Sequence, residues 1–239
     1  MELKKLHTMK KTTFLKIVLL IFVFLQHFNS YSQNYIPFAP RYNQDIKGDM
    51  LLIGNSILNR APNPNTAYND NGLNSNFNMQ FINIDNGATP GVFNSSSANL
   101  VVPNSNALGT PCYKIRYAAL YWGAVTRGAA PITNVKFKMP TGGYNDVTGT
   151  VIYNAGAAVI GTSKPYACFA DVTSLVTSAA NANPEGTYTL ANVSSAVGSN
   201  GGTGLSAGWS LFIVYEDPKL PTKSITSFDG FSAISATSN

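Results

Sequence analysis

The sequence predicts an all-β fold, a two-sheet sandwich of the jelly-roll kind with one short helix. Three observations lead to this prediction. Short apolar runs with the two-residue period of a strand recur at intervals of about ten residues. Clusters of Gly, Asn and Pro separate these runs, and almost no segment shows the period of a helix. Short, regularly spaced strands joined by turns are typical of sandwiches and jelly rolls.

The strongest of these runs is the stretch from Ala207 to Pro218, AGWSLFIVYEDP. One of its faces carries Trp209, Leu211, Ile213 and Tyr215, and the other carries Ser210, Phe212, Val214 and Glu216. A strand that is largely apolar on both faces lies inside a sheet that is covered front and back. We expect Asp217-Pro218 to end it, because proline cannot donate to a hydrogen-bond ladder.

The predicted partner of this strand is the stretch from Cys112 to Val125, CYKIRYAALYWGAV. Two sets of residues alternate along it, namely Ile115, Tyr117, Ala119 and Tyr121 with Arg116, Ala118, Leu120 and Trp122. Both tryptophans of the chain lie in these two stretches. Aromatic side chains bury the most area per residue, so the two strands are expected to form the core of one domain.

The other elements follow from local signals, taken in chain order. Residues 33–47 are expected to form an extended arm, and residues 60–75, rich in Asn, Pro and Gly, a long loop. Asp171 is placed to cap a helix over residues 172–179. Asp229-Gly230-Phe231 is expected to open a further turn and strand. The remaining strands are predicted at 48–58, 78–85, 99–102, 134–139, 148–153, 166–170, 186–194 and 223–228.

Residues 1–32 have the pattern of a secretory signal peptide. Lysines at the start are followed by the apolar run from Ile17 to Leu25 and by small residues at Ser30 and Ser32. Cleavage after Ser32 leaves Gln33 as the new N-terminus. The apolar run is about half the length that a membrane-spanning helix needs, and no Cys follows the cleavage point to accept a lipid. We therefore expect an exported protein without a membrane span in the mature chain.

Loss of the leader changes the charge and the chemistry of the chain. Five lysines and one glutamate leave with it, so the formal charge falls from +5 to about +1, too small for a nucleic-acid-binding surface. His7 and His27, the two histidines of the chain, leave as well. A Ser-His-Asp triad, a Cys-His dyad and a histidine-built zinc site are then excluded.

Carboxylates are the remaining candidates for catalysis. The mature chain has two glutamates, Glu185 in a turn and Glu216 beside Asp217 at the end of the central strand. Two carboxylates on either side of a bond can hydrolyse a glycoside. The simpler interpretation is that Glu216 and Asp217 are charges leaving a buried strand for solvent. The sequence therefore predicts neither catalytic nor cofactor-binding residues.

Calcium is the metal that the loops could accept, through carboxylate and amide oxygens. The candidates are Asp70, in a run of Asn and Asp, and Asp85, in the turn Asp85-Asn86-Gly87. Neither segment has the twelve-residue loop with a terminal glutamate that marks an EF-hand. Plain turn formation is the competing interpretation.

Cys112 and Cys168 are the two cysteines, and an exported protein meets an oxidising compartment. We expect them to form a disulfide, with two separate buried thiols as the alternative. The bond would close a loop of about 56 residues and stabilise the fold by roughly 4 kcal/mol in the chain-entropy model.

Six segments together resemble the N-terminal domain of very large cell-surface proteins of Bacteroidota, including the flavobacterial gliding adhesins of the SprB type. In chain order they are GDMLLIGNSIL at 48–58, FNSSSANL at 93–100, CYKIRYAALYWGAV at 112–125, YACFADVTSLV at 166–176, GTYTLANV at 186–193, and AGWSLFIVYEDP with ITSFDGF within 207–231. The resemblance implies export by the type IX secretion machinery and display at the cell surface. It supplies no catalytic residues.

On this basis we expect one β-sandwich domain over residues 48–239, the N-terminal part of a longer, non-enzymatic adhesin. Its expected partners are the type IX secretion and surface motility machinery and external surfaces or glycans. The alternative is a carbohydrate-binding jelly roll that uses loop asparagines and exposed tyrosines, among them Tyr35, Tyr42, Tyr68 and Tyr144. A third hypothesis is a glycosidase or lyase that uses Asp and Glu.

Overall fold

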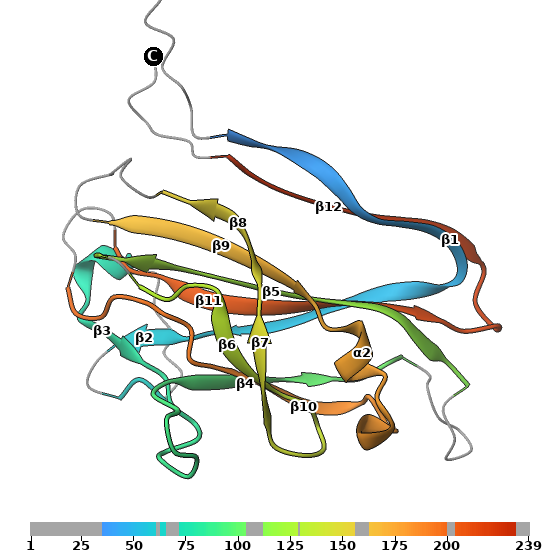
Figure 1. Ribbon diagram of the computed structural model, residues 1–239, viewed down its shortest axis with the longest axis horizontal. Coiled ribbons are helices and arrows are strands. Elements are labelled where there is room, and N and C mark those ends of the chain that lie inside the picture. Colours follow the sequence, from blue (N-terminus) through green and yellow to red (C-terminus); the bar gives the residue numbers. More distant parts are fainter. Residues whose placement is uncertain are drawn as a thin grey trace, which may run out of the picture. The chain divides into compact units, whose positions relative to one another are not determined.

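The computed structural model in Figure 1 describes residues 35–60, 63–65, 72–103, 112–128, 130–155, 163–199 and 204–232. The chain divides into two units. One consists of residues 1–35 and 232–239, of which only Tyr35 and Ser232 are described. The other unit, Ile36–Phe231, is the folded domain. The predicted cleavage site at Ser32 and Gln33 and the calcium candidate Asp70 lie outside the described residues.

The domain is all-β, as predicted, and its sheets pack as a sandwich. A six-stranded sheet has the order β12-β1-β11-β5-β9-β8, a four-stranded sheet the order β4-β10-β6-β7, and a small sheet pairs β2 with β3. The strands are β1 Tyr35–Ser56, β2 Leu58–Arg60, β3 Met79–Phe81, β4 Ser95–Leu100, β5 Lys114–Thr126, β6 Asn134–Lys138, β7 Tyr144–Thr148, β8 Thr150–Asn154, β9 Lys164–Asp171, β10 Gly186–Ala191, β11 Ala207–Glu216 and β12 Thr222–Ser232.

The central pair of strands is the one that the sequence predicts. Strands β11 and β5 are antiparallel neighbours, and Trp209 lies directly opposite Trp122. Both indoles are buried and donate hydrogen bonds, Trp122 Nε1 to the Ile132 carbonyl at 2.8 Å and Trp209 Nε1 to Ser96 Oγ at 2.9 Å. The second bond reaches strand β4, so Trp209 joins the two sheets through the core between them.

Both faces of β11 are covered, as its sequence predicts. Leu211 and Ile213 belong to the core between the two large sheets. Val214, on the opposite face, packs in a second cluster with Tyr117 and Ile225. This second cover comes from the first half of β1 and from β12, which form a ribbon over the outer face of the six-stranded sheet (Figure 1).

Strand β1 makes the ribbon possible because it doubles back on itself (Figure 1). Its second half, from Gly48, pairs with β11. A Cβ atom on Gly48 would lie 2.0 Å from the Tyr215 carbonyl oxygen, so only glycine lets the chain bend this close to β11. The predicted arm of residues 33–47 is therefore extended where it is described, but it is half of a core-covering strand and not a separate leader into the domain.

Two aromatic and charged contacts attach the ribbon to the sheet. The Arg41 guanidinium lies 4.4 Å from the ring centre of Phe169 and forms two hydrogen bonds with the Asp229 carboxylate, at 2.7 and 3.0 Å. The rings of Tyr42 and Tyr117 stack with centres 4.8 Å apart. The predicted turn at Asp229-Gly230-Phe231 is wrong, because these residues continue β12, and Asp229 holds Arg41 within the ribbon.

A β-bulge corrects the predicted pattern of β5. Tyr215 of β11 lies opposite Ile115 and Val214 lies opposite Tyr117, so Arg116 is an extra residue in the ladder. The bulge turns Ile115 onto the inner face, where it packs against the main core, whereas the two-residue period of the sequence predicts it beside Tyr117. Arg116 is left partly exposed and pairs with Glu216.

The helix and one strand also differ from the prediction. Helix α2 spans only Thr173–Val176, and the chain is already extended at Ser178. The predicted cap is one residue out: Asp171 is the last residue of β9 and its carboxylate accepts a hydrogen bond from the Thr173 N–H at 2.9 Å, but the N-cap of the helix is Val172, which makes no side-chain bond. Strand β7 escapes prediction because YNDVT has polar residues on its solvent side and one buried residue, Val147.

The predicted disulfide is wrong for this structure. Cys168 of β9 is buried and lies opposite Trp122 of β5, whereas Cys112 is exposed just before β5 begins at Lys114. Lys114 and Trp122 are separated by about 25 Å of continuous strand, and a disulfide needs Cα atoms within about 7 Å. The Cys168 thiol instead donates a hydrogen bond to the Ile132 carbonyl at 3.4 Å, and its burial raises its pKa to about 11.

Candidate functional site

The carboxylates singled out in the sequence each have a local structural partner. Glu216 forms an ion pair with Arg116, with 2.7 Å between its Oε2 and the Arg116 Nε. The Asp217 carboxylate is buried and accepts the Lys219 N–H at 2.9 Å. Glu185 accepts the Val102 N–H at 2.6 Å. These contacts hold the C-terminal end of β11 and the turn before β10, and they bring no two of these three carboxylates to opposite sides of a cleft.

The calcium candidate Asp85 forms a turn. Asn86 and Gly87 both have positive φ angles, 52° and 82°, as the predicted Asn-Gly turn requires. The two carboxylate oxygens of Asp85 accept hydrogen bonds from the N–H and the hydroxyl of Thr89, at 2.7 and 2.9 Å. Among the described residues, no group of three or more His, Cys, Asp or Glu side chains could hold a metal ion.

A cavity of about 370 Å³ lies beside helix α2 at the start of β5. Its lining includes Ile115, Val176 and Pro184, with Lys114 as its one charged side chain. Tyr113 also lines it, but the Tyr113 hydroxyl is a buried atom without a hydrogen-bond partner and offers no accessible donor. The cavity therefore has no arrangement of acids and bases for catalysis.

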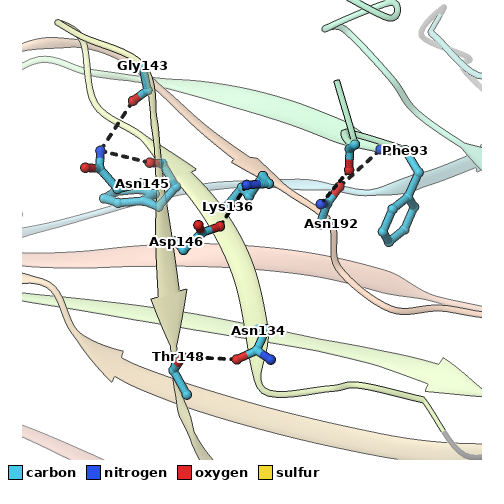
Figure 2. A network of polar contacts seen from close by, with 10 residues as sticks. Phe93, Asn134, Lys136, Gly143, Asn145, Asp146, Thr148 and Asn192 are labelled. Carbon is cyan, nitrogen blue, oxygen red and sulfur yellow. Dashed lines mark hydrogen bonds and ion pairs between the residues drawn. The ribbon is translucent and has the colours of Figure 1, made fainter. Parts of the chain in front are cut away.

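A network of polar contacts lies on strands β6 and β7 of the four-stranded sheet (Figure 2). In β6, Val135 and Phe137 point into the core, and the residues between them point away from it. The two strands are in register. We call the resulting set of outward side chains the β6–β7 polar face; it consists of Asn134, Lys136 and Lys138 of β6 and Tyr144, Asp146 and Thr148 of β7.

The side chains of the β6–β7 polar face are paired across the two strands. Thr148 Oγ1 donates to Asn134 Oδ1 at 3.0 Å, and Lys136 Nζ donates to Asp146 Oδ1 at 2.8 Å (Figure 2). In the third pair, Lys138 Nζ lies 5.8 Å from the ring centre of Tyr144. Burial raises the pKa of Tyr144, and the negative charge of Asp85 raises it further. Three pairs in a row thus place these polar groups side by side across the two strands.

The pairing leaves hydrogen-bonding capacity for a partner. The Asp146 side chain is 84 % exposed while that of Lys136 is 28 % exposed. An ion pair at such a surface contributes only about 0–1 kcal/mol to stability, and the exposed oxygens of Asp146 can still accept further hydrogen bonds. Ammonium, carboxylate, amide, hydroxyl and phenol groups occur within three successive pairs, spaced about 7 Å apart along each strand.

Asn192 holds the loop that contains Gly91 and Phe93, next to the β6–β7 polar face (Figure 2). Asn192 follows Ala191 of β10, which pairs with Lys136, and takes a left-handed φ of 63°. Its amide accepts from the Phe93 N–H at 3.1 Å and donates to the Gly91 carbonyl at 2.9 Å. Phe93 is about half exposed, so an aromatic ring is available beside the polar sheet.

Of the four tyrosines expected to be exposed, Tyr144 alone belongs to this face. Tyr42 is partly buried in the ribbon contact with Tyr117. The side chain of Tyr35 and all of Tyr68 lie outside the described residues. Sequence reasoning found β6 but missed the face, although the alternation of NVKFK contains its signal: every second residue of that strand is polar.

Comparisons with known proteins do not identify a family for this chain. In the described part of the chain there is also no helix with the length and apolar character to cross a membrane. No protein-family model, no curated protein and no solved structure matches the chain.

Proposed function

We propose that this chain is a non-enzymatic adhesin domain, the N-terminal part of a longer secreted protein, and that it attaches cells to glycan-bearing surfaces through the β6–β7 polar face. The observation that carries the proposal is the row of three cross-strand pairs, Asn134 with Thr148, Lys136 with Asp146, and Lys138 with Tyr144. Export by the type IX machinery and a role in gliding motility belong to the same proposal and come from the sequence resemblance.

The chemistry of the face suits sugars. Each sugar hydroxyl both donates and accepts a hydrogen bond, and the face offers donors at Lys136 and Lys138 and acceptors at Asp146 and Asn134. The partly buried ring of Tyr144 adds an apolar plane on which a sugar ring can stack. A uniformly charged surface would favour ions instead, but here one carboxylate and two ammonium groups alternate with neutral groups.

The fold supports binding without rearrangement. The inner neighbours of the face, Val135 and Phe137, are buried in the main core, and Phe137 is completely buried. The strands are therefore held rigid, and the polar groups are already paired. Binding then loses little conformational entropy, which is the main cost for a flexible polar surface.

Attachment of the purified chain to glycan-coated beads tests the proposal. Asp146→Ala and Tyr144→Ala should each weaken attachment about tenfold, as expected for the loss of one well-placed contact worth about 1.4 kcal/mol. The matched control is Thr226→Ala, which removes a hydrogen bond to Asn43 on the distant ribbon and should leave attachment unchanged. Equal attachment by all variants, or none by the parent chain, contradicts the proposal.

A carbohydrate-binding module is the second candidate, and Tyr144 beside Lys138 favours it. A glycan array distinguishes the two functions. A module should bind one glycan class and lose it in Tyr144→Ala, whereas a general adhesin should attach to many surfaces and show no dominant array signal. In cells, deletion of the gene should impair attachment and spreading on agar if the adhesin proposal holds.

A further inference from the structure

The last part of β1, residues 50–56, is a free edge of the six-stranded sheet (Figure 1). On one side it pairs with β11. On the other side, β12 begins at Thr222, where Lys223 contacts Asp49, and then runs along the first half of β1. Residues 50–56 extend past that beginning, and no other described strand pairs with them.

The direction of the backbone groups along this edge follows from the bonds to β11. The Ile57 N–H donates to Ala207 and the Lys47 carbonyl accepts from Asp217, so the odd-numbered residues bond to the β11 side. The even-numbered residues therefore point outward. Two of their N–H groups bond to the preceding side chain, Met50 to Asp49 and Ser56 to Asn55. The N–H groups of Leu52 and Gly54 point toward the open edge.

The side chains at this edge are unusually apolar for an exposed strand. Met50 is 53 % exposed and Leu52 is 67 % exposed. Between Asp49 and Asn55 there is neither a charged residue nor a proline. Proteins usually protect free edges with such residues, because an open row of backbone groups is a template for another strand. An apolar, unprotected edge indicates a strand partner.

We infer that the partner is a second copy of this chain, paired antiparallel along β1 with the two-fold axis at Leu52. In this register the outward N–H of Leu52 meets the Leu52 carbonyl of the other copy, and the outward N–H of Gly54 meets the Met50 carbonyl. The two open donors on each copy are thus matched to acceptors. A two-fold contact needs a self-complementary surface, and this strand has one.

The side chains fit the same register. Met50 lies across from Gly54 of the second copy, which has no side chain to compete for space. Leu52 lies across from Leu52 of the second copy. Leu51 faces Ile53 on the inner side, where both are already partly buried. Asp49, the one charged residue of the segment from Gly48 to Ser56, faces the neutral amide of Asn55 instead of a like charge.

Sedimentation velocity of the purified chain over a concentration series tests the inference. The parent chain should form a dimer, and Leu52→Lys should weaken it about tenfold or more by placing two ammonium groups opposite each other. Leu52 is exposed, so this variant keeps its fold. The matched control is Phe228→Lys on β12, a similarly exposed apolar position at 58 %, which should leave the dimer intact. A parent chain that is monomeric throughout, or a Leu52→Lys chain that dimerises equally well, overturns the inference.

Cysteine cross-linking tests the register itself, in a Cys112→Ser background that removes the exposed native thiol. Leu52→Cys should cross-link under mild oxidation, because directly opposite hydrogen-bonded residues have Cα atoms about 5.5 Å apart, within disulfide reach. Met50→Cys faces Gly54 and should not cross-link. Cross-linking of Met50→Cys in preference to Leu52→Cys would overturn the proposed pairing. Variants in the β6–β7 polar face should not alter either result.

Discussion

Removal of the Tyr117 hydroxyl should stabilise the protein. Tyr117 is 7 % exposed and lies under the ribbon, stacked on Tyr42 and in edge contact with Phe212. Its hydroxyl oxygen is buried and has no hydrogen-bond partner. Tyr117→Phe keeps the ring and its contacts. It removes only the hydroxyl, which gives up its hydrogen bonds to water on folding and gains none in the protein.

The magnitude follows from the cost of an unsatisfied buried group, about 1–3 kcal/mol. Tyr117→Phe should therefore raise the free energy of unfolding by at least about 1 kcal/mol, which is about 2–4 °C in Tm for a domain of this size. Tyr166→Phe is the matched control, because the Tyr166 hydroxyl donates to the Ser194 carbonyl at 2.8 Å. Loss of that bond should lower the free energy of unfolding by about 1 kcal/mol.

Urea denaturation followed by fluorescence measures both variants, since the two buried tryptophans report on the core. The two substitutions remove the same atom from the same residue type, so only the hydrogen-bond environment differs. Opposite shifts of the midpoint at an unchanged m-value are the expected result. If Tyr117→Phe lowers the midpoint as Tyr166→Phe does, then the hydroxyl is satisfied in solution and the reasoning fails.

Three further predictions concern the core, its titration and its thiols. Leu211→Ala should lower the free energy of unfolding by about 3–5 kcal/mol in urea denaturation, because Leu211 is completely buried between the sheets. Burial raises the pKa of Tyr121 to about 12, so the folded state keeps a proton that the unfolded state loses above about pH 10. Unfolding free energies measured across alkaline pH should stay level below that value and fall above it; a level profile to pH 12 would contradict this. Cys168 should resist alkylation in the native protein and react only after unfolding without reductant, whereas a Cys112–Cys168 disulfide would keep it unreactive in both states, as mass spectrometry can distinguish.

The candidate site shows where sequence reasoning reaches its limit. The alternation of NVKFK predicts which residues of β6 face solvent, but it does not say which strand lies beside it. The partner, β7, has one buried residue and a polar composition, so its period is weak. The pairs of the β6–β7 polar face exist only because the register of two strands brings them together, and register depends on both strands.

Some features are determined by local residues alone: the all-β class, the two-sided burial of β11 and the Asn86-Gly87 turn. Other features arise only when distant segments meet. Strand β1 doubles back as a cover, a bulge at Arg116 turns Ile115 inward, and Cys112 and Cys168 lie far apart. Alternation and turn propensity depend on a few neighbouring residues, so the local sequence predicts them. Strand pairing, bulges and the path of a strand depend on contacts between residues far apart in the chain.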